Sequence, residues 1–300
     1  MSILHYRHSF QEEAAKVWRD MSAAWHLNVP RNEETVTEEL LLNLARKHKW
    51  LGLEIEAYSK GAEGKNGADW AFWFYDGPKI SIETSVGVGA RVQAKRLYPE
   101  SGRYEKLFHQ SRSQEKASTD GLTPNQCQVL LSHHDGLVPI YLFYNSSNLD
   151  LRSILKSSHE TLRLRKLCAD CIIPEFWGIT AASAEAIKNA NWGKKNDKPG
   201  DFPMVPWHCM LRMPQPIGLA SGRSFAAAVA RILKELNYLA FTEGMDRSEP
   251  SEIYSPREGA PKWASLLGKL PEVEEELNAL MDELNLRGIA VIGRDESLKD

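Results

Sequence analysis

The chain has 300 residues, of which 42% are hydrophobic and 26% charged, and its formal net charge is -3. This composition excludes a largely disordered chain, and the charge excludes a uniformly basic protein that coats nucleic acid, while a local basic cleft stays open. The sequence contains no apolar run of membrane-spanning length and no signal-peptide pattern, so we expect a cytoplasmic protein without membrane contact.

The first predicted elements are two helices. Apolar residues recur at helical spacing over 9–25, and we interpret residues 1–29 as an N-terminal helix that packs on the core. Thr35 followed three residues later by Glu38 is a capping-box pattern ahead of a leucine-rich stretch. We therefore predict a second helix over about 35–48.

After residue 48 the spacing of apolar residues changes from a helical pattern to the alternation of extended strands. "GLEIEAYSK" (52–60) predicts a short strand, and "DWAFWFYDG" (69–77) predicts an aromatic one. "KISIETS" (79–85) and "ARVQAKRL" (90–97) predict two more strands, joined by a glycine-bearing turn at "VGVG" (86–89).

Two helices and a strand follow. "SGRYEKLFHQSRSQ" (101–114) predicts a basic helix, and 123–136 predicts another, with Thr123 as its N-cap. "VPIYLFYN" (138–145) predicts a strand. Residues 30–150 thus predict an α/β unit, a mixed central sheet flanked by helices.

The rest of the chain, residues 151–300, predicts a mainly helical C-terminal region. Helical patterns occupy 180–193, 222–240 and 270–288, and a short strand is predicted over 289–295.

Three polar residues stand out within the predicted strands. Asp69 opens an apolar strand, where a charge is costly unless it faces a cleft, although it also fits a turn residue that ends the preceding loop. Gln93 and Lys95 share one face of their strand because side chains alternate. A carboxylate and an amide oxygen suit Mg²⁺, and an ammonium beside them can orient a metal-bound water and stabilise charge on a phosphate.

The second helix offers a further carboxylate. Glu34 and Glu38 lie four residues apart and so share a face near its N-terminus, with Glu33 and Glu39 as competitors. Glu38 is also explained as the capping-box partner. We predict that Glu34 or Glu38 joins the metal site.

These features together resemble the PD-(D/E)XK nuclease superfamily, with its restriction-endonuclease-like fold. The resemblance is carried by the helix glutamate, by "GADW" and "VQAK", and by "NQCQVLL" followed by "PIYLFYN". It is strongest to the Mrr-like and Holliday-resolvase-like branch, in which QxK replaces (D/E)xK. It covers about residues 30–148.

The resemblance implies roles for individual residues. Asp69 becomes the motif aspartate and a ligand of Mg²⁺ (or Mn²⁺), Gln93 a second ligand, and Lys95 the catalytic lysine. Glu34 or Glu38 matches the helix glutamate. The sequence departs from the pattern in its long spacer between Asp69 and Lys95, and Glu83 competes with Gln93 as ligand.

A basic stretch beside "VQAK" predicts contacts to a polyanion, with a solvated surface as the alternative. The residues that we predict to bind nucleic acid are Arg91, Arg96, Arg103, Tyr104, Lys106 and Arg112.

The four cysteines are too few and too scattered for a disulfide scaffold. Cys168 and Cys171 form one CxxC pair, and His208 and Cys209 are adjacent, so these four residues could hold a structural zinc ion. We favour ordinary reduced thiols.

The function that we predict is a Mg²⁺-dependent endonuclease acting on DNA, and the family resemblance suggests a role in bacterial defence. One alternative is a non-catalytic nucleic-acid-binding or assembly protein, in which Asp69 and Lys95 form a buried ion pair. Another is a nuclease directed at RNA. Besides DNA, the partners that we consider are a second copy of the chain and a regulatory protein.

Overall fold

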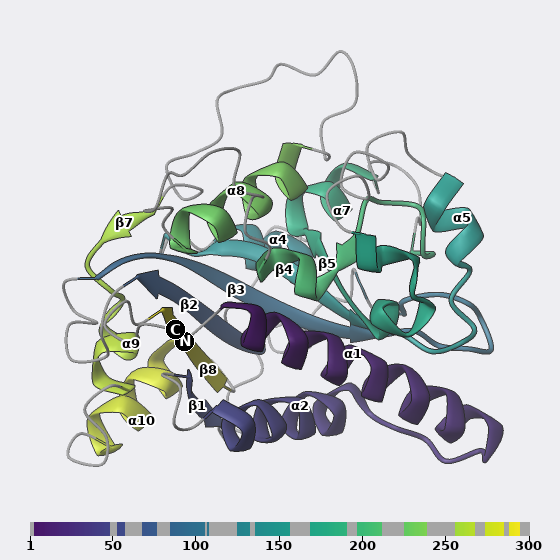
Figure 1. The fold of residues 1–300 in the computed structure, drawn as a ribbon, viewed down its shortest axis with the longest axis horizontal. Coiled ribbons are helices and arrows are strands. Elements are labelled where there is room, and N and C mark those ends of the chain that lie inside the picture. Colours follow the sequence, from purple (N-terminus) through teal and green to yellow (C-terminus); the bar gives the residue numbers. More distant parts are fainter. Residues whose placement is uncertain are drawn as a thin grey trace, which may run out of the picture.

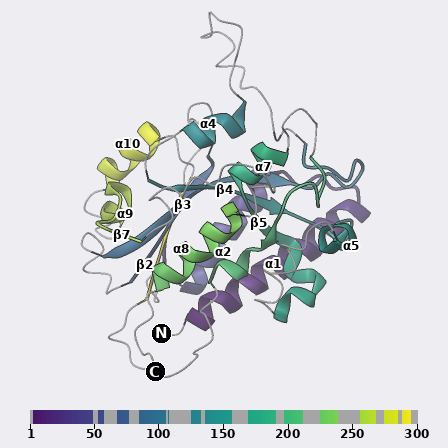
Figure 2. The ribbon, with the colours of Figure 1, turned by 90° about the horizontal axis from the view of Figure 1, so that it is seen from above.

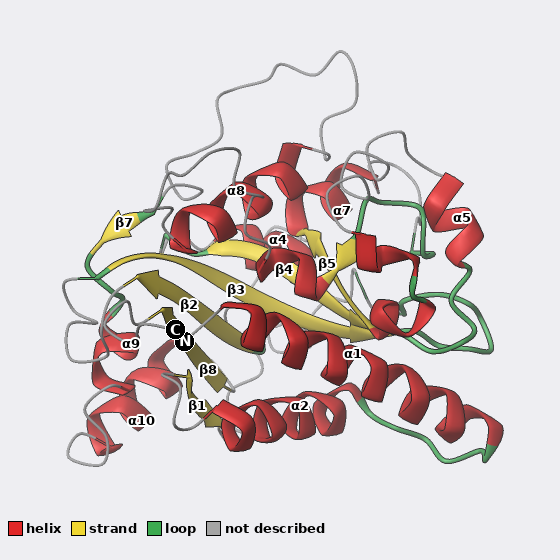
Figure 3. Ribbon diagram, in the orientation of Figure 1, coloured by secondary structure: helices red, strands yellow, loops and turns green. Residues whose placement is uncertain are grey.

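The computed structural model describes thirteen stretches of the chain: residues 3–48, 53–57, 68–76, 85–105, 107, 125–132, 136–156, 169–190, 197–211, 225–238, 256–267, 274–284 and 288–294. Within them the protein has an α/β fold, in which helices flank one mixed sheet (Figures 1 and 3). This confirms the fold class predicted from the sequence.

The described strands form one sheet in the order β1-β8-β2-β3-β4-β5-β6, with β7 paired to β3 outside this path. Their bounds are β1 Leu53–Ala57, β2 Trp70–Asp76, β3 Val86–Arg96, β4 Val138–Tyr144, β5 Ile179–Ser183, β6 Val205–Pro206, β7 Arg257–Glu258 and β8 Gly288–Arg294.

The middle of the sheet is built from β2, β3 and β4. β2 runs antiparallel to β3, and β3 runs parallel to β4, with α4 (Gln126–Ser132) between them in the chain. Nearly all residues of these three strands are buried. Strands that are covered on both faces have nearly continuous apolar sequences. A polar residue within such a strand therefore indicates a specific role for its side chain.

Helices lie over both faces of the sheet. On one face, Phe72 and Phe74 of β2 contact Phe10 of α1 (Ile3–His26) and Phe225 of α8 (Phe225–Tyr238), with ring centroids 6.4 and 6.0 Å apart. Because Trp70 pairs with Val92, Gln93 points to the opposite face, toward α4. Figure 2 shows α4 on one side of the sheet and α1 and α8 on the other.

The other helices of the described chain are α2 Glu33–His48, α5 Leu151–Lys156, α7 Ala184–Ala190, α9 Lys262–Leu267 and α10 Glu274–Leu284. Three 3₁₀ helices complete it: η2 Ala169–Ile172, η3 Pro174–Gly178 and η4 Trp207–Leu211.

The glycines of "VGVG" lie inside β3, so the turn predicted there is wrong. A Cβ on Gly87 would lie 2.4 Å from Cζ2 of Trp73, and one on Gly89 would lie 2.1 Å from Cδ2 of Leu137. Glycine is therefore required by the close approach of these side chains and not by a turn.

Two helix starts also differ from the prediction. α2 begins at Glu33, which places Thr35 and Glu38 inside the helix and removes the predicted capping box. A capping box is instead present at the start of α4. The Asn125 Oδ1 accepts a hydrogen bond from the Gln128 backbone N–H (3.0 Å), and the Gln128 side chain accepts one from the Asn125 backbone N–H (2.8 Å). The predicted cap, Thr123, lies outside the described residues.

The C-terminal half contributes strands to the same sheet. β8 inserts between β1 and β2, parallel to β2 and antiparallel to β1, while β5 and β6 extend the sheet beyond β4. Asp76, at the end of β2, accepts hydrogen bonds from the first two backbone N–H groups of α8 (2.6 and 3.0 Å). The boundary predicted near residue 150 therefore does not divide the sheet.

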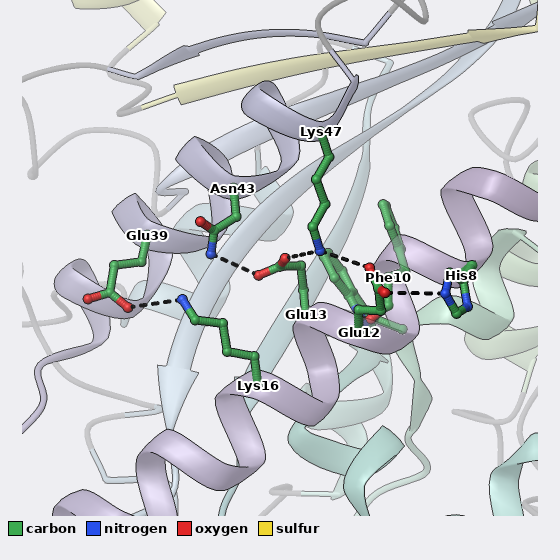
Figure 4. A network of polar contacts seen from close by, with 9 residues as sticks. His8, Phe10, Glu12, Glu13, Lys16, Glu39, Asn43 and Lys47 are labelled. Carbon is green, nitrogen blue, oxygen red and sulfur yellow. Dashed lines mark hydrogen bonds and ion pairs between the residues drawn. The ribbon is translucent and has the colours of Figure 1, made fainter.

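A network of charged side chains joins α1 to α2 (Figure 4). Lys47 donates to Glu12 (2.9 Å) and to the nearly buried Glu13 (2.7 Å), whose other oxygen accepts from Asn43 (3.0 Å). Lys16 lies 3.8 Å from Glu39 across the same interface. Each of these α1 and α2 carboxylates thus faces a partner on the other helix.

No helix among the described residues combines the length and the apolar character needed to cross a membrane.

Candidate active site at the ends of strands β2 and β3

Asp69 lies just before β2 and points toward β3. Its backbone N–H donates to the Val92 carbonyl (2.8 Å), which continues the β2–β3 ladder. Its Oδ2 accepts hydrogen bonds from Gln93 Nε2 (2.6 Å) and from the Ala94 N–H (2.8 Å). Asp69 lies in a bend directly before β2 and is buried, with its carboxylate held by β3.

Gln93 connects Asp69 to α4. While its Nε2 donates to Asp69, its Oε1 accepts a hydrogen bond from Gln126 Nε2 (2.7 Å). Gln93 is 1% exposed, so these two contacts orient an amide away from bulk water. Gln126 was not recognised from the sequence as part of a site.

Lys95 shares the face of Gln93 and contacts α2. Its Nζ lies 3.3 Å from Glu33 Oε1, and the lysine is buried while the glutamate is partly exposed. Glu33 faces the protein because it is one turn before Thr37, whose hydroxyl hydrogen-bonds the Tyr144 hydroxyl (2.7 Å). The α2 glutamate in contact with the predicted lysine is thus Glu33.

The two helix glutamates predicted as ligands are placed differently. Glu38 is exposed to solvent, so the structure does not place it in this cluster, and that prediction is corrected. Glu34 is partly buried, and its negative charge contributes to the raised pKa of Asp69. Glu83, the competitor of Gln93, lies outside the described residues.

The protein environment makes Asp69 difficult to ionise. The pKa of its carboxyl is raised to about 7, chiefly by burial and also by the negative charges of Glu33 and Glu34. The charge of Lys95 and the Ala94 N–H act in the opposite direction without overcoming burial. A cation placed here would compensate a charge that the cluster itself compensates poorly.

The cluster contains oxygen donors of the type that hard divalent cations bind. Asp69 and Glu33 supply carboxylate oxygens, and Gln93 has an amide oxygen that faces the site once the amide rotates by half a turn. After that rotation the Gln93 nitrogen could donate to a likewise rotated Gln126 amide, so the contact to α4 would be kept. Oxygen donors of this kind suit Mg²⁺ or Mn²⁺.

The predicted nucleic-acid contacts fall into three groups. Arg91 and Tyr104 are buried, and the Tyr104 hydroxyl donates to Asn145 (2.7 Å), so their assignment to a DNA-contacting surface is wrong. Arg96 stacks over the Tyr98 ring (4.1 Å), and Arg103 pairs with Asp197 (2.6 Å). Both are partly exposed and stay candidates, while the remaining two, Lys106 and Arg112, lie outside the described residues.

The helix predicted over 101–114 does not begin where the sequence suggested. Residues 99–102 form a turn, closed by a bridge between Tyr98 and Arg103. The turn places Tyr104 against Phe143 of β4, with ring centroids 4.2 Å apart, so this segment serves the core.

Three of the four predicted zinc ligands lie together, on the 3₁₀ helices η2 and η4. Cys171, His208 and Cys209 are buried, with ligand atoms within 4.8 Å of one another. Cys168 lies outside the described residues.

Comparison with known protein families identifies the family of this chain. A model described as a family of unknown function (DUF6615) matches residues 6–297, nearly the whole chain. The chain belongs to this family. No curated protein and no solved structure matches it. The DUF6615 match runs from α1 to β8, so both halves of the sheet, including the strand inserted between β1 and β2, fall within it.

Two site residues, Glu33 and Gln126, required the structure to be assigned. A signal for Glu33 exists in the sequence, since Val36, Thr37, Leu40 and Leu41 follow it at helical spacing and mark the buried face. For Gln126, whose partner Gln93 is 33 residues away, the apolar pattern around it does not indicate a role in the site.

Proposed function

We propose that the protein is a metal-dependent nuclease that hydrolyses phosphodiester bonds of DNA. The observation that carries the proposal is the convergence of Asp69, Gln93 and Lys95 with Glu33 in one largely buried cluster. The order of elements around it, α2-β1-β2-β3-α4-β4, is also the order in which the resemblance to PD-(D/E)XK nucleases places its motifs.

Each residue would have a separate task. Asp69, Gln93 and Glu33 would hold Mg²⁺ or Mn²⁺, which when bound supplies an activated water and stabilises charge on the phosphate. Lys95 would leave Glu33 and place its ammonium beside the scissile phosphate, where it stabilises the negative charge that develops in the transition state. Asp69 must lose its proton to act as a ligand, so activity should rise with pH through about 7.

The substrate class rests on charge. Two cations, Lys95 and the bound metal, suit a phosphodiester, and the partly exposed Arg96 and Arg103 follow on the same stretch of chain. A role in defence against foreign DNA is what the family resemblance suggests. RNA is the second candidate substrate, because the same groups would act on either sugar-phosphate backbone.

The test is cleavage of supercoiled and linear DNA, and of RNA, by the full-length protein with Mg²⁺ or Mn²⁺. We expect cutting that requires the metal and is lost in Asp69→Asn, with Glu38→Gln as the matched control because Glu38 is exposed. Circular dichroism would confirm that the variants fold. Metal-dependent binding without cutting of any substrate would contradict the nuclease proposal and support a binding protein that retains this site.

A further inference from the structure

We propose that Cys171, His208 and Cys209 form a structural binding site for a thiophilic divalent ion of the zinc class. The site is independent of the proposed nuclease centre, because its ligands come from η2 and η4 and not from β2, β3 or α2.

All three ligand atoms lie within 4.8 Å of one another, and two of the three pairs are already at the separations that a tetrahedral ion requires. Cys171 Sγ is 3.5 Å from Cys209 Sγ, and Cys209 Sγ is 3.8 Å from His208 Nε2. Bond lengths of about 2.3 Å to sulfur and about 2.0 Å to nitrogen place tetrahedral ligands roughly 3.4 to 3.8 Å apart. One ion can therefore reach all three atoms with little movement.

The type and burial of the ligands favour zinc over magnesium. Two sulfurs and an imidazole select soft or borderline ions, whereas Mg²⁺ requires oxygen. Cys171, His208 and Cys209 are 4%, 0% and 6% exposed, so a substrate could not reach an ion bound there. These properties assign the site a structural role.

The surrounding contacts hold both ligand segments against α1. Asp170, beside Cys171, accepts hydrogen bonds from Arg7 (2.5 Å) and Gln11 (2.8 Å). Trp207, beside His208, donates to the Phe10 carbonyl (2.7 Å) and stacks on the Phe10 ring (3.9 Å).

Further contacts orient the ligands themselves. The Cys171 carbonyl accepts from the Trp177 indole (2.9 Å), and the His208 ring meets Phe176 edge-on (5.4 Å). A metal would therefore join η2 to η4 through ligands such as Cys171 and Cys209, 38 residues apart in the chain, at a point where both elements are already positioned. Three protein ligands leave one tetrahedral position for a water molecule or a further ligand.

The experiment measures metal in the full-length protein, purified under reducing conditions without a histidine tag. We expect about one zinc ion per chain by elemental analysis. Cys209→Ser should lose at least about nine-tenths of it, as expected when a thiolate ligand is removed. Cys127→Ser is the matched control, because Cys127 is also buried but contacts Ala184 on α7, and it should keep its zinc.

A spectroscopic measurement keeps the proposal testable if Cys209→Ser does not fold. Wild-type protein stripped of metal and loaded with Co²⁺ should show the visible bands of tetrahedral cobalt and a thiolate charge-transfer band. Absence of zinc from the native protein together with absence of these bands would overturn the proposal. A mass two hydrogens lower, with Cys171 linked to Cys209 in the natively purified protein, would also overturn it in favour of a disulfide.

Discussion

Two regions of this molecule place carboxylates beside lysines, and they treat the charges in opposite ways. Between α1 and α2, hydrogen bonding to Lys47 lowers the pKa of Glu12, which is about half exposed. At the ends of β2 and β3, burial raises the pKa of Asp69 to about 7 even though Lys95 is near. A nearby lysine therefore does not by itself decide whether the pKa of a carboxyl is lowered or raised.

The comparison separates a structural network from a candidate active site. In the network, both oxygens of Glu13 have partners, and Lys47 bridges two carboxylates, so the charges are compensated within the protein (Figure 4). In the strand-end cluster, Asp69 is opposed by a single nearby lysine and is also repelled by Glu33 and Glu34. Such a cluster favours a bound cation, and perturbed groups of this kind concentrate at functional sites.

The largest expected effect is on the rate of DNA cleavage, and it distinguishes Lys95 from Lys47. We predict that Lys95→Met lowers the rate of DNA cleavage about 1000-fold, because a cation that stabilises the transition state is removed. Lys47→Met, which removes the matching lysine of the network, should keep the wild-type rate and lose only stability. Single-turnover cleavage with both variants measures this, and equal losses in the two would erase the distinction between the regions.

A smaller effect is expected for metal affinity and distinguishes two glutamates of α2. Glu33→Gln should weaken Mn²⁺ binding about 10- to 100-fold, because a carboxylate at the proposed site loses its charge. Glu38→Gln should bind as the wild type does, since its side chain is exposed. Isothermal titration calorimetry at pH 8 gives both constants, and unchanged affinity in Glu33→Gln would remove Glu33 from the site.

The dependence of stability on pH should differ in sign between the two regions. Asp69 has a folded pKa of about 7, well above the value of about 4 in an unfolded chain, so the folded state retains a proton that the unfolded state has lost. Its contribution to the free energy of unfolding therefore falls as pH rises from about 4 to 7. Asp69→Asn should match the wild type near pH 4 and be about 4 kcal/mol more stable at pH 8, without metal.

Urea unfolding at the two pH values, in the presence of a chelator, measures this difference. If Asp69→Asn were less stable than the wild type at pH 8, the ionised carboxylate would be a stabilising member of an ion pair, as in the binding-protein alternative.

The smallest expected effect concerns Glu12 in the network. Its pKa is lowered, so its contribution is present at neutral pH and is lost on acidification through the lowered pKa. Because the side chain is about half exposed, Glu12→Gln should cost less than about 1 kcal/mol, and the cost should shrink in 1 M salt. Thermal unfolding at low and high salt tests this, and a salt-independent cost would indicate a contact other than the ion pair.

Much of the fold was predictable because it depends on local patterns. Residues 69–77 and 138–145 were predicted as strands and form β2 and β4, and the helices predicted over 35–48 and 222–240 correspond to α2 and α8. The shared face of Gln93 and Lys95 also followed from the sequence, since alternation along a strand needs no knowledge of its neighbours.

Other features depend on distant parts of the chain. The insertion of β8 between β1 and β2, the burial of Arg91 and Tyr104, and the approach of Cys171 to Cys209 have no local signal. From the sequence, the glycines before Ala90 predicted a turn. Only the structure shows that they lie in β3, where the Trp73 side chain occupies the space next to them.

By itself, the sequence determined the α/β class and the three residues at the centre of the candidate site, Asp69, Gln93 and Lys95. The tertiary structure decided which partners complete them, Glu33 from α2 and Gln126 from α4. The physical reason is that side-chain direction within a strand is set by its own backbone. Which glutamate reaches Lys95 depends instead on where α2 begins and how it rotates against the sheet, and packing alone sets both.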